Sequence, residues 1–287
     1  MDERAFVEAL RALAPHPAAR GLSDDCAVLE LGGELLVLTH DSLVEGLHFL
    51  PGQDPADVAW KLVATNLSDL AAKGAEPLGV LLGYQLGSDD ARFLAGLEQV
   101  LVHYNVPLLG GDTVGGSGPQ VVGLTALGRA THRPVPSRSG AQVGDALYVT
   151  GPLGAALAGF EAFKGGTGDS LAYRRPQALL AEGQALAPLV TAMMDISDGL
   201  LLDAARMAAA SGVTLAIDST SVPIALPAAR RDEALRWGDD YQLLFTVREG
   251  LTLPVAATRI GTAVPAGTSS VLLDGLAPSG PLGYEHR

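Results

Sequence analysis

Residues 54–77 read DPADVAWKLVATNLSDLAAKGAEP, and their pattern is the most informative about the fold class. Asp54 can cap a helix, Pro55 suits the first turn and Gly74 follows the last apolar residues, so the pattern predicts one long helix. Strand-like runs lie before and after it along the chain. A helix between strands predicts a sheet with helices packed on it.

Short β-branched or leucine-rich runs predict the strands. They cover residues 26–31, 34–39, 78–86, 106–109, 120–128, 145–150, 213–217, 241–247 and 259–264. Further helices are predicted from Ser88, from near Ser197 and, as a short amphipathic helix, at the N-terminus. Strands alternating with helices predict an α/β fold, or α+β layers, of mixed sheets with packed helices.

The chain has 287 residues, a length that accommodates two ordinary domains. Residues 131–145, THRPVPSRSGAQVGD, are rich in Pro, Ser and Gly and predict a joint between two halves. We therefore expect an N-terminal α/β domain at 1–136 and a C-terminal α/β domain at 137–287.

Composition excludes several classes of function. With 19 basic and 32 acidic residues the net charge is −13, which disfavours nucleic acid or an anionic membrane as the main partner. The single cysteine, Cys26, cannot form an internal disulfide, and no run has the length and apolarity of a signal peptide or a membrane span. A cytoplasmic protein is expected.

The residues most informative about function are acidic ones at predicted strand ends and helix starts. They are Asp24, Asp25, Asp41, Asp69, Asp112, Asp195 and Asp198. Any one of them alone is more simply a turn or cap residue. Several carboxylates held close together would destabilise a fold without cations, and hard oxygen ligands in this number suit Mg²⁺. The sequence therefore predicts a site for several magnesium ions.

Two segments suggest how a phosphate could bind. Gly110 and Gly111 precede Asp112 after a strand, which predicts a turn whose backbone approaches a ligand closely. In DISDGL, Ser197 and the amides of the following helix could receive a phosphate, although a simple N-cap role for Ser197 explains the pattern equally well. Walker, protein-kinase, GxGxxG and GxSxG motifs are absent from the sequence. A zinc site at His40 and His48 is disfavoured because no HExxH spacing occurs.

Taken in order, seven segments resemble the thiamine-monophosphate kinases, a family of the aminoimidazole ribonucleotide synthetase-like superfamily. They are SDDCAVL, THDSLVEGLHF, DPADVAWKLVATNLSDLAAKGAEP, LLGGDT, RSGAQVGDALYVTGPLG, DISDGLLLD and GDDYQLLFTV, within residues 21–247. The resemblance implies a two-domain aminoimidazole ribonucleotide synthetase-like fold and a homodimer formed through the N-terminal sheet. It also implies transfer of the ATP γ-phosphoryl group to thiamine monophosphate, giving thiamine diphosphate, with several Mg²⁺ ions.

The resemblance also implies roles for individual residues. Magnesium ligands would be Asp25, Thr39, Asp41, Asp69, Asp112, Asp195 and Asp198. ATP contacts would be Gly111, Asp112, Arg138 and Ser197, and substrate contacts would be His48, Asp239 and Tyr284. No general base is assigned, because the acceptor phosphate is already ionised at neutral pH and in-line transfer needs cations and positioning.

The chain departs from the family pattern at several positions. Ser23 stands where a glycine is usual, and His40 stands where a threonine contacts metal. Gly115 stands where an arginine often follows the GGDT segment. Lys73 replaces an apolar residue, and Asp239 replaces a glutamate that is one methylene longer.

Other activities remain open at this stage. A sister synthetase that activates an amide or formyl oxygen is the main alternative, although its glycine-rich N-terminal signature is not visible. Selenophosphate synthesis and hydrogenase maturation are disfavoured by the cysteine pattern. A non-catalytic cation-binding or nucleotide-sensing protein would explain the departures as decay.

Overall fold

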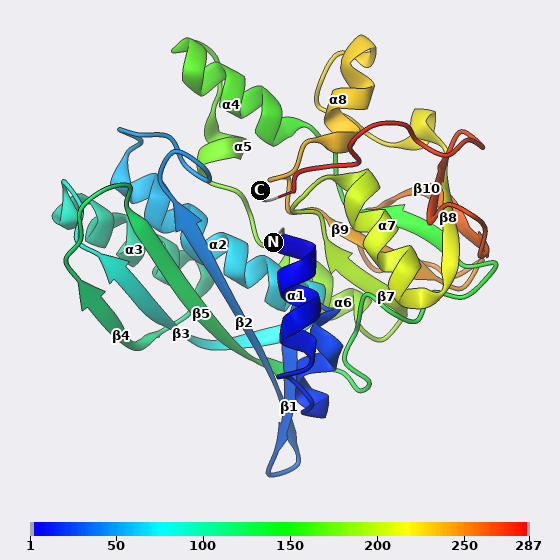
Figure 1. Ribbon diagram of the computed structural model, residues 1–287, viewed down its shortest axis with the longest axis horizontal. Helices are drawn as coiled ribbons and strands as arrows, with labels where there is room; N and C mark the ends of the chain where they lie inside the picture. Colours follow the sequence, from blue (N-terminus) through cyan, green and yellow to red (C-terminus); the bar gives the residue numbers. More distant parts are fainter. Residues whose placement is uncertain (1–2, 286–287) are drawn as a thin grey trace.

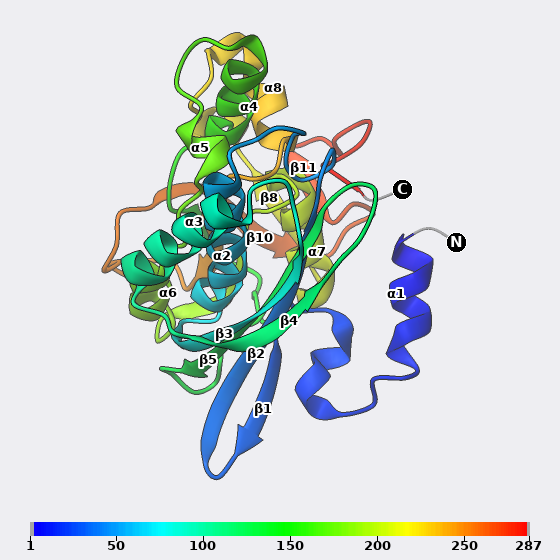
Figure 2. The same ribbon diagram turned by 90° about the vertical axis from the view of Figure 1, so that its left-hand side faces the viewer.

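A computed structural model describes residues 3–285 and contains two mixed β-sheets with helices packed against them (Figure 1). The predicted α/β class of mixed sheets and packed helices is confirmed. The N-terminal helix is also confirmed as α1 (Glu3–Arg11), and a 3-10 helix (Pro17–Leu22) connects it to the first sheet. In Figure 2, α1 stands apart from the sheets.

The first sheet has the strand order β1-β2-β5-β3-β4. Its strands are β1 (Ala27–Leu31), β2 (Glu34–Val44), β3 (Ala75–Gln85), β4 (Leu108–Val114) and β5 (Val121–Ala130). Helices α2 (Pro55–Ala72) and α3 (Asp90–Tyr104) pack together. As predicted, Asp54 caps α2, its Oδ1 accepting a hydrogen bond from Ala56 N at 3.0 Å. Almost every residue of α2 is buried, because it lies between the first sheet and the second half of the chain.

The second sheet has the order β11-β8-β10-β6-β9-β7. Its strands are β6 (Ala146–Val149), β7 (Val190–Asp195), β8 (Val213–Ile217), β9 (Leu243–Val247), β10 (Thr258–Pro265) and β11 (Val271–Leu273). Helix α7 (Leu200–Ser211) packs against this sheet, and its apolar face forms a core with β7 and β8. The remaining helices are α4 (Ala155–Gly165), α5 (Leu171–Arg174), α6 (Leu180–Leu186) and α8 (Arg231–Arg236), with 3-10 helices at Ser219–Ser221 and Ala228–Arg230. The sequence did not predict these helices, nor β7 and β11.

One local prediction was wrong, because the chain does not turn at Gly110 and Gly111. Strand β4 instead runs on through Asp112 to Val114, parallel to β3. At Gly111 φ is +152°, and a Cβ there would lie 1.9 Å from the carbonyl oxygen of Leu82. The glycine therefore permits β4 to pair closely with β3.

The first sheet has one covered and one open face. Val80, Val122 and Leu124 point towards α2 and are fully buried. Residues of the opposite face are exposed, including Leu81, Leu109, Val114 and Val121. An apolar sheet face without a covering layer is a feature of protein interaction surfaces.

Candidate functional site

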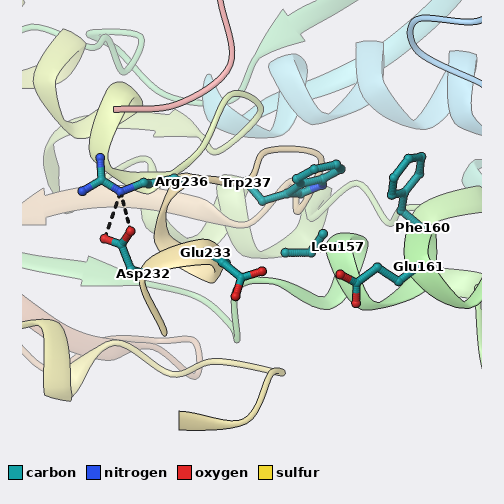
Figure 3. A pocket seen from close by; sticks show the side chains of 7 residues that line it. All are labelled: Leu157, Phe160, Glu161, Asp232, Glu233, Arg236 and Trp237. Atoms are coloured by element: carbon teal, nitrogen blue, oxygen red, sulfur yellow. Dashed lines mark hydrogen bonds and ion pairs between the residues drawn. The ribbon is translucent and has the colours of Figure 1, made fainter. Parts of the chain in front are cut away.

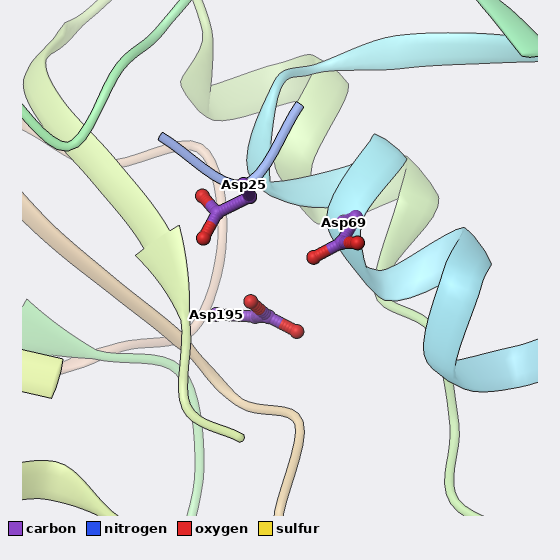
Figure 4. Close-up of side chains that lie close together, drawn as sticks. All are labelled: Asp25, Asp69 and Asp195. Carbon is purple, nitrogen blue, oxygen red and sulfur yellow. The ribbon is translucent and has the colours of Figure 1, made fainter. Parts of the chain in front are cut away.

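Three carboxylates from three separate elements meet between the two sheets (Figure 4). Asp25 lies in the loop before β1, Asp69 in the last turn of α2, and Asp195 at the end of β7. One ligand oxygen from each lies within 4.8 Å of those from the other two. The structure thus brings together residues from both halves of the chain.

Neighbouring side chains fix the orientation of these carboxylates. The Thr39 hydroxyl donates to Asp69, and the Ser68 hydroxyl donates to Asp195 Oδ2 at 2.6 Å. Arg138 Nε donates to Asp25 Oδ1 at 2.7 Å. Each carboxylate is therefore held in place before any ligand binds.

The electrostatics of the cluster favour a bound cation. Burial, reinforced by the charges of Asp41 and Asp195, raises the pKa of Asp69 well above its ordinary value. Burial and the charge of Asp25 raise the pKa of Asp195 to about 7. These shifts reflect burial together with neighbouring negative charge, and carboxylate oxygens are the preferred ligands of Mg²⁺. The residues therefore fit a divalent cation.

Asp24, adjacent to this trio, is in the opposite situation. Its Oδ1 lies 2.5 Å from Lys73 Nζ, and its Oδ2 lies 2.5 Å from Arg20 Nη1. Burial alone would raise the pKa of Asp24, but the charges and hydrogen bonds of Lys73 and Arg20 outweigh it and lower the pKa. Asp24 is thus a structural ion-pair partner.

Asp41 lies on β2, two residues after Thr39, so both side chains point to the same face of the sheet. Burial raises the pKa of Asp41, the charge of His40 lowers it, and the charges of Asp25 and Asp198 raise it, so Asp41 is within electrostatic reach of the cluster. His40 itself points to the other face, where its Nδ1 lies 2.9 Å from Thr125 Oγ1.

The loop before α7 is organised by Asp203. Its Oδ2 accepts hydrogen bonds from the backbone N–H groups of Ser197 and Asp198, at 3.1 and 3.0 Å. Arg206 pairs with both Asp198 and Asp203. Helix α7 begins at Leu200 after Gly199, so Ser197 is not its N-cap. The two amides at 197 and 198 are used within the loop, which holds the Asp198 carboxylate near the cluster.

A second polar group joins α2 to the loop before β9. The buried Lys61 Nζ lies 2.6 Å from Asp239 Oδ2 and donates to the His48 carbonyl oxygen at 3.0 Å. Tyr241 donates to Asp239 Oδ1 at 3.0 Å. The structure thus brings two of the predicted substrate residues together around a lysine that the sequence analysis missed. The sequence did offer a signal for this residue, namely a lysine in the middle of an apolar helix.

Tyr284 lies in the C-terminal segment. Its backbone N–H donates to the carbonyl oxygen of Asp198 at 2.9 Å. This hydrogen bond holds the end of the described chain beside the loop before α7.

Gly111 and Asp112 lie apart from this site within one chain. Asp112 pairs with Gly83 on β3, and β4 is three strands from β2 in the sheet, or roughly 14 Å. By alternation, Asp112 points to the open face of the sheet and Asp41 to the covered one. A single chain does not unite these two aspartates.

A pocket of about 450 Å³ lies between α4 and α8 (Figure 3). It is lined by Leu157, Phe160, Glu161, Asp232, Glu233, Arg236 and Trp237. Arg236 pairs with Asp232, while Arg230 pairs with both Glu161 and Glu233. Each of its carboxylates already has an arginine partner, so we assign no ligand to it.

Comparison with known proteins places this arrangement in a class. Residues 23–130 match the family "AIR synthase related protein, N-terminal domain", and residues 142–271 match the corresponding C-terminal domain. The chain is thus a two-domain protein of the AIR synthase-related class. It is 38% identical over 253 residues to the thiamine-monophosphate kinase of Escherichia coli K12, covering 80% of this chain and 76% of the relative. The chain belongs to the thiamine-monophosphate kinase family.

Solved structures agree with this assignment. A structure described as AaThiL complexed with AMPPCP and TMP matches with a TM-score of 0.89 and 29% identity, covering 100% of this chain and 97% of that one. The thiamine-monophosphate kinase of Stenotrophomonas maltophilia K279a matches with a TM-score of 0.77 and 34% identity, covering 96% of each chain. Among the described residues, no helix combines the length and apolarity needed to cross a membrane.

Proposed function

We propose that this chain transfers the γ-phosphoryl group of ATP to thiamine monophosphate at a multi-magnesium aspartate site, as its family membership indicates. The observation that carries the proposal is the meeting of Asp25, Asp69 and Asp195 from both halves of the chain, with pKa values raised for Asp69 and Asp195. Both reactants are anionic, so a site that gathers cations suits their approach.

The residues that would hold Mg²⁺ are Asp25, Thr39, Asp41, Asp69, Asp112, Asp195 and Asp198. Bound Mg²⁺ would neutralise the charge that the phosphates carry in the transition state. The protein's own contribution is to fix the carboxylates in position. Ser68 and Thr39 orient two of them, and Arg206 restrains Asp198.

Several other residues are proposed to position the reactants. Arg138 and Ser197 would contact ATP, and the Arg138 guanidinium is well suited to phosphate oxygens. His48, Asp239 and Tyr284 would contact thiamine monophosphate. Lys61 holds Asp239 and the backbone of His48 in place. No proton needs to be removed from the acceptor phosphate, so no general base is assigned.

We also propose that the enzyme is a homodimer whose subunits meet through the open face of the first sheet. That face exposes Leu81, Leu109, Val114 and Val121. Asp112 lies on the same face, so pairing would carry Gly111 and Asp112 towards the partner's site. Each active site would then combine the aspartate cluster of one subunit with Asp112 of the partner subunit.

Two coarser proposals complete this assignment. We place the domain boundary near Ser137, because Arg138 and its neighbours then form the joint across which the two halves share one site. We place the enzyme in the cytoplasm, where ATP is available.

The test is product formation by the purified protein with ATP and Mg²⁺. Thiamine monophosphate, unphosphorylated thiamine and no acceptor are compared, and the thiamine product is identified by mass. Thiamine diphosphate should form from the monophosphate alone. ATP binding without this product would refute the proposed reaction and favour a sister activity or a nucleotide sensor.

A further inference from the structure

A lysine ammonium lies inside the acidic cluster. Lys73 follows α2 directly, and its side chain is fully buried, with 0% exposed. Its Nζ lies 2.5 Å from Asp24 Oδ1 and 2.6 Å from Asp25 Oδ2, and donates to the Met193 carbonyl oxygen at 3.3 Å. The protein thus supplies a fixed positive charge at one corner of its proposed metal site.

Asp25 is shared between this lysine and the rest of the cluster. Arg138 binds Asp25 Oδ1, and Lys73 lies against Oδ2. The contact with Lys73 is an ion pair without hydrogen-bond geometry, because Oδ2 has no hydrogen-bond partner among the described residues. Both oxygens of Asp25 therefore already face a cation.

A divalent ion on the same oxygen would be close to the ammonium. Mg–O distances are about 2.1 Å, so an ion bound at Asp25 Oδ2 would lie roughly 4 Å from Lys73 Nζ. Repulsion at this distance in a partly buried site is strong. Asp69 and Asp195 have no such ion pair, since their side-chain hydrogen bonds among the described residues come from hydroxyl groups.

We propose that Lys73 is a built-in counter-ion that takes the place of one divalent cation at Asp25. The nucleotide complex then holds one fewer divalent ion per protomer than the same site with an apolar residue at position 73. The inference depends on the proposed function for the identity of the ions and the nucleotide. It assigns Lys73 a positioning role in the site, with no contact to the substrate.

The test is to count divalent ions rather than to measure turnover. Mn²⁺ is titrated into the wild type and K73M in the presence of AMPPCP, and free Mn²⁺ is followed by electron paramagnetic resonance. K73M keeps the unbranched side chain but removes the charge. It should bind one additional Mn²⁺ per protomer, or bind its weakest ion at least roughly tenfold more tightly. K164M, which removes a lysine from α4, is the matched control and should titrate like the wild type.

An unchanged count and unchanged affinity in K73M would overturn the proposal. K73R, which keeps the charge, should titrate like the wild type, and an additional ion in K73R would also overturn it. Loss of the Lys73 charge beside the buried Asp24 and Asp25 should lower the melting temperature of metal-free K73M, and Mn²⁺ should restore it. If neither K73M nor K73Q folds at any Mn²⁺ concentration, no divalent ion can replace Lys73 and the proposal fails.

These outcomes are separable from those of the product assay. An additional ion in K73M together with a wild type that makes no thiamine diphosphate would retain the role of Lys73 and reject the reaction. Normal product formation with equal ion counts would retain the reaction and reject the role of Lys73.

Discussion

The aspartate cluster and the end of β4 are both rich in ligand groups, yet they differ in almost every physical respect. Asp25, Asp69 and Asp195 lie between the two sheets, held by hydrogen bonds from neighbouring side chains. Gly111 and Asp112 lie on an exposed edge strand. The first region is assembled by the fold of one chain, whereas the second faces the solvent on the open side of a sheet.

This difference shows what each region lacks. The cluster has its protein ligands in place but carries uncompensated negative charge, so it lacks cations. The β4 region has an exposed carboxylate and a backbone without side chains at Gly110 and Gly111, so it lacks an opposing surface. In our proposal, bound Mg²⁺ provides the cations that the cluster lacks, and a second subunit provides the surface opposite β4.

The largest effect is expected from neutralising a carboxylate inside the cluster. D69N should reduce turnover on the order of 10³-fold, because it removes a charged ligand of the proposed magnesium site. Since burial raises the pKa of Asp69, its charge costs stability in the metal-free protein, and D69N should raise the metal-free melting temperature. Steady-state kinetics and thermal unfolding measure the two effects. E249Q, which alters an exposed ion pair with Arg259, should change neither. Unchanged turnover in D69N would remove Asp69 from the site.

The proposed sharing of sites between subunits can be tested by complementation. D112N alone should be as inactive as D69N but should leave stability almost unchanged, because Asp112 is exposed. Co-expression of the two variants should restore about a quarter of wild-type activity, since half of randomly formed dimers contain one intact site. If Asp112 served its own subunit, both sites of every mixed dimer would be defective and no activity would return.

These two regions also differ in how far the sequence could predict them. Asp25 directly precedes a predicted strand, Asp69 lies near the end of the predicted long helix, and Asp195 lies just before the helix predicted near Ser197, so a shared metal site could be anticipated. The ion pair of Asp24 with Lys73 could not be anticipated, because the two residues are 49 positions apart and only the fold brings them together. The glycine pair before Asp112 predicted a turn, as glycines after a strand often do. Pairing with β3 instead extends the strand, an interaction that local sequence does not encode.

The fold class followed from alternating strands and helices, and the long helix α2 was predicted with its cap. Strand β7 was missed although it carries Asp195, because VTAMMD is short and has little alternation. The role of Lys61 was also missed, because it depends on a contact between residues far apart in the sequence. One of its partners, Asp239, comes from the other half of the chain, and only the fold brings it to Lys61.

A smaller effect is expected from changing the open face of the first sheet. L81R places a charge at a side chain that is 46% exposed in one chain. If that face is buried in a dimer, L81R should shift the protein towards monomers by analytical ultracentrifugation, and turnover should fall roughly tenfold or more, in step with the remaining fraction of dimer. L276R, at a surface position outside this sheet, should remain dimeric. A dimeric L81R would place the interface elsewhere.

The smallest effect concerns Asp240, a buried carboxylate outside the proposed metal site and the proposed dimer interface. Asp240 accepts hydrogen bonds from the N–H groups of Gly154 and Ala156 at the start of α4, yet burial raises its pKa from 3.8 to about 6. Between these values the folded protein keeps a proton that the unfolded chain releases, so stability falls as pH rises, by up to about 3 kcal/mol. Asparagine cannot titrate, so the stability difference between wild type and D240N should shift in favour of D240N from pH 4 to pH 6.5 and then stay constant. Urea unfolding at several pH values measures this difference. Mg²⁺ should leave this difference unchanged, because Asp240 lies outside the aspartate cluster. A stability difference that stays constant from pH 4 to pH 6.5 would show that the amide hydrogen bonds fully offset the burial of Asp240.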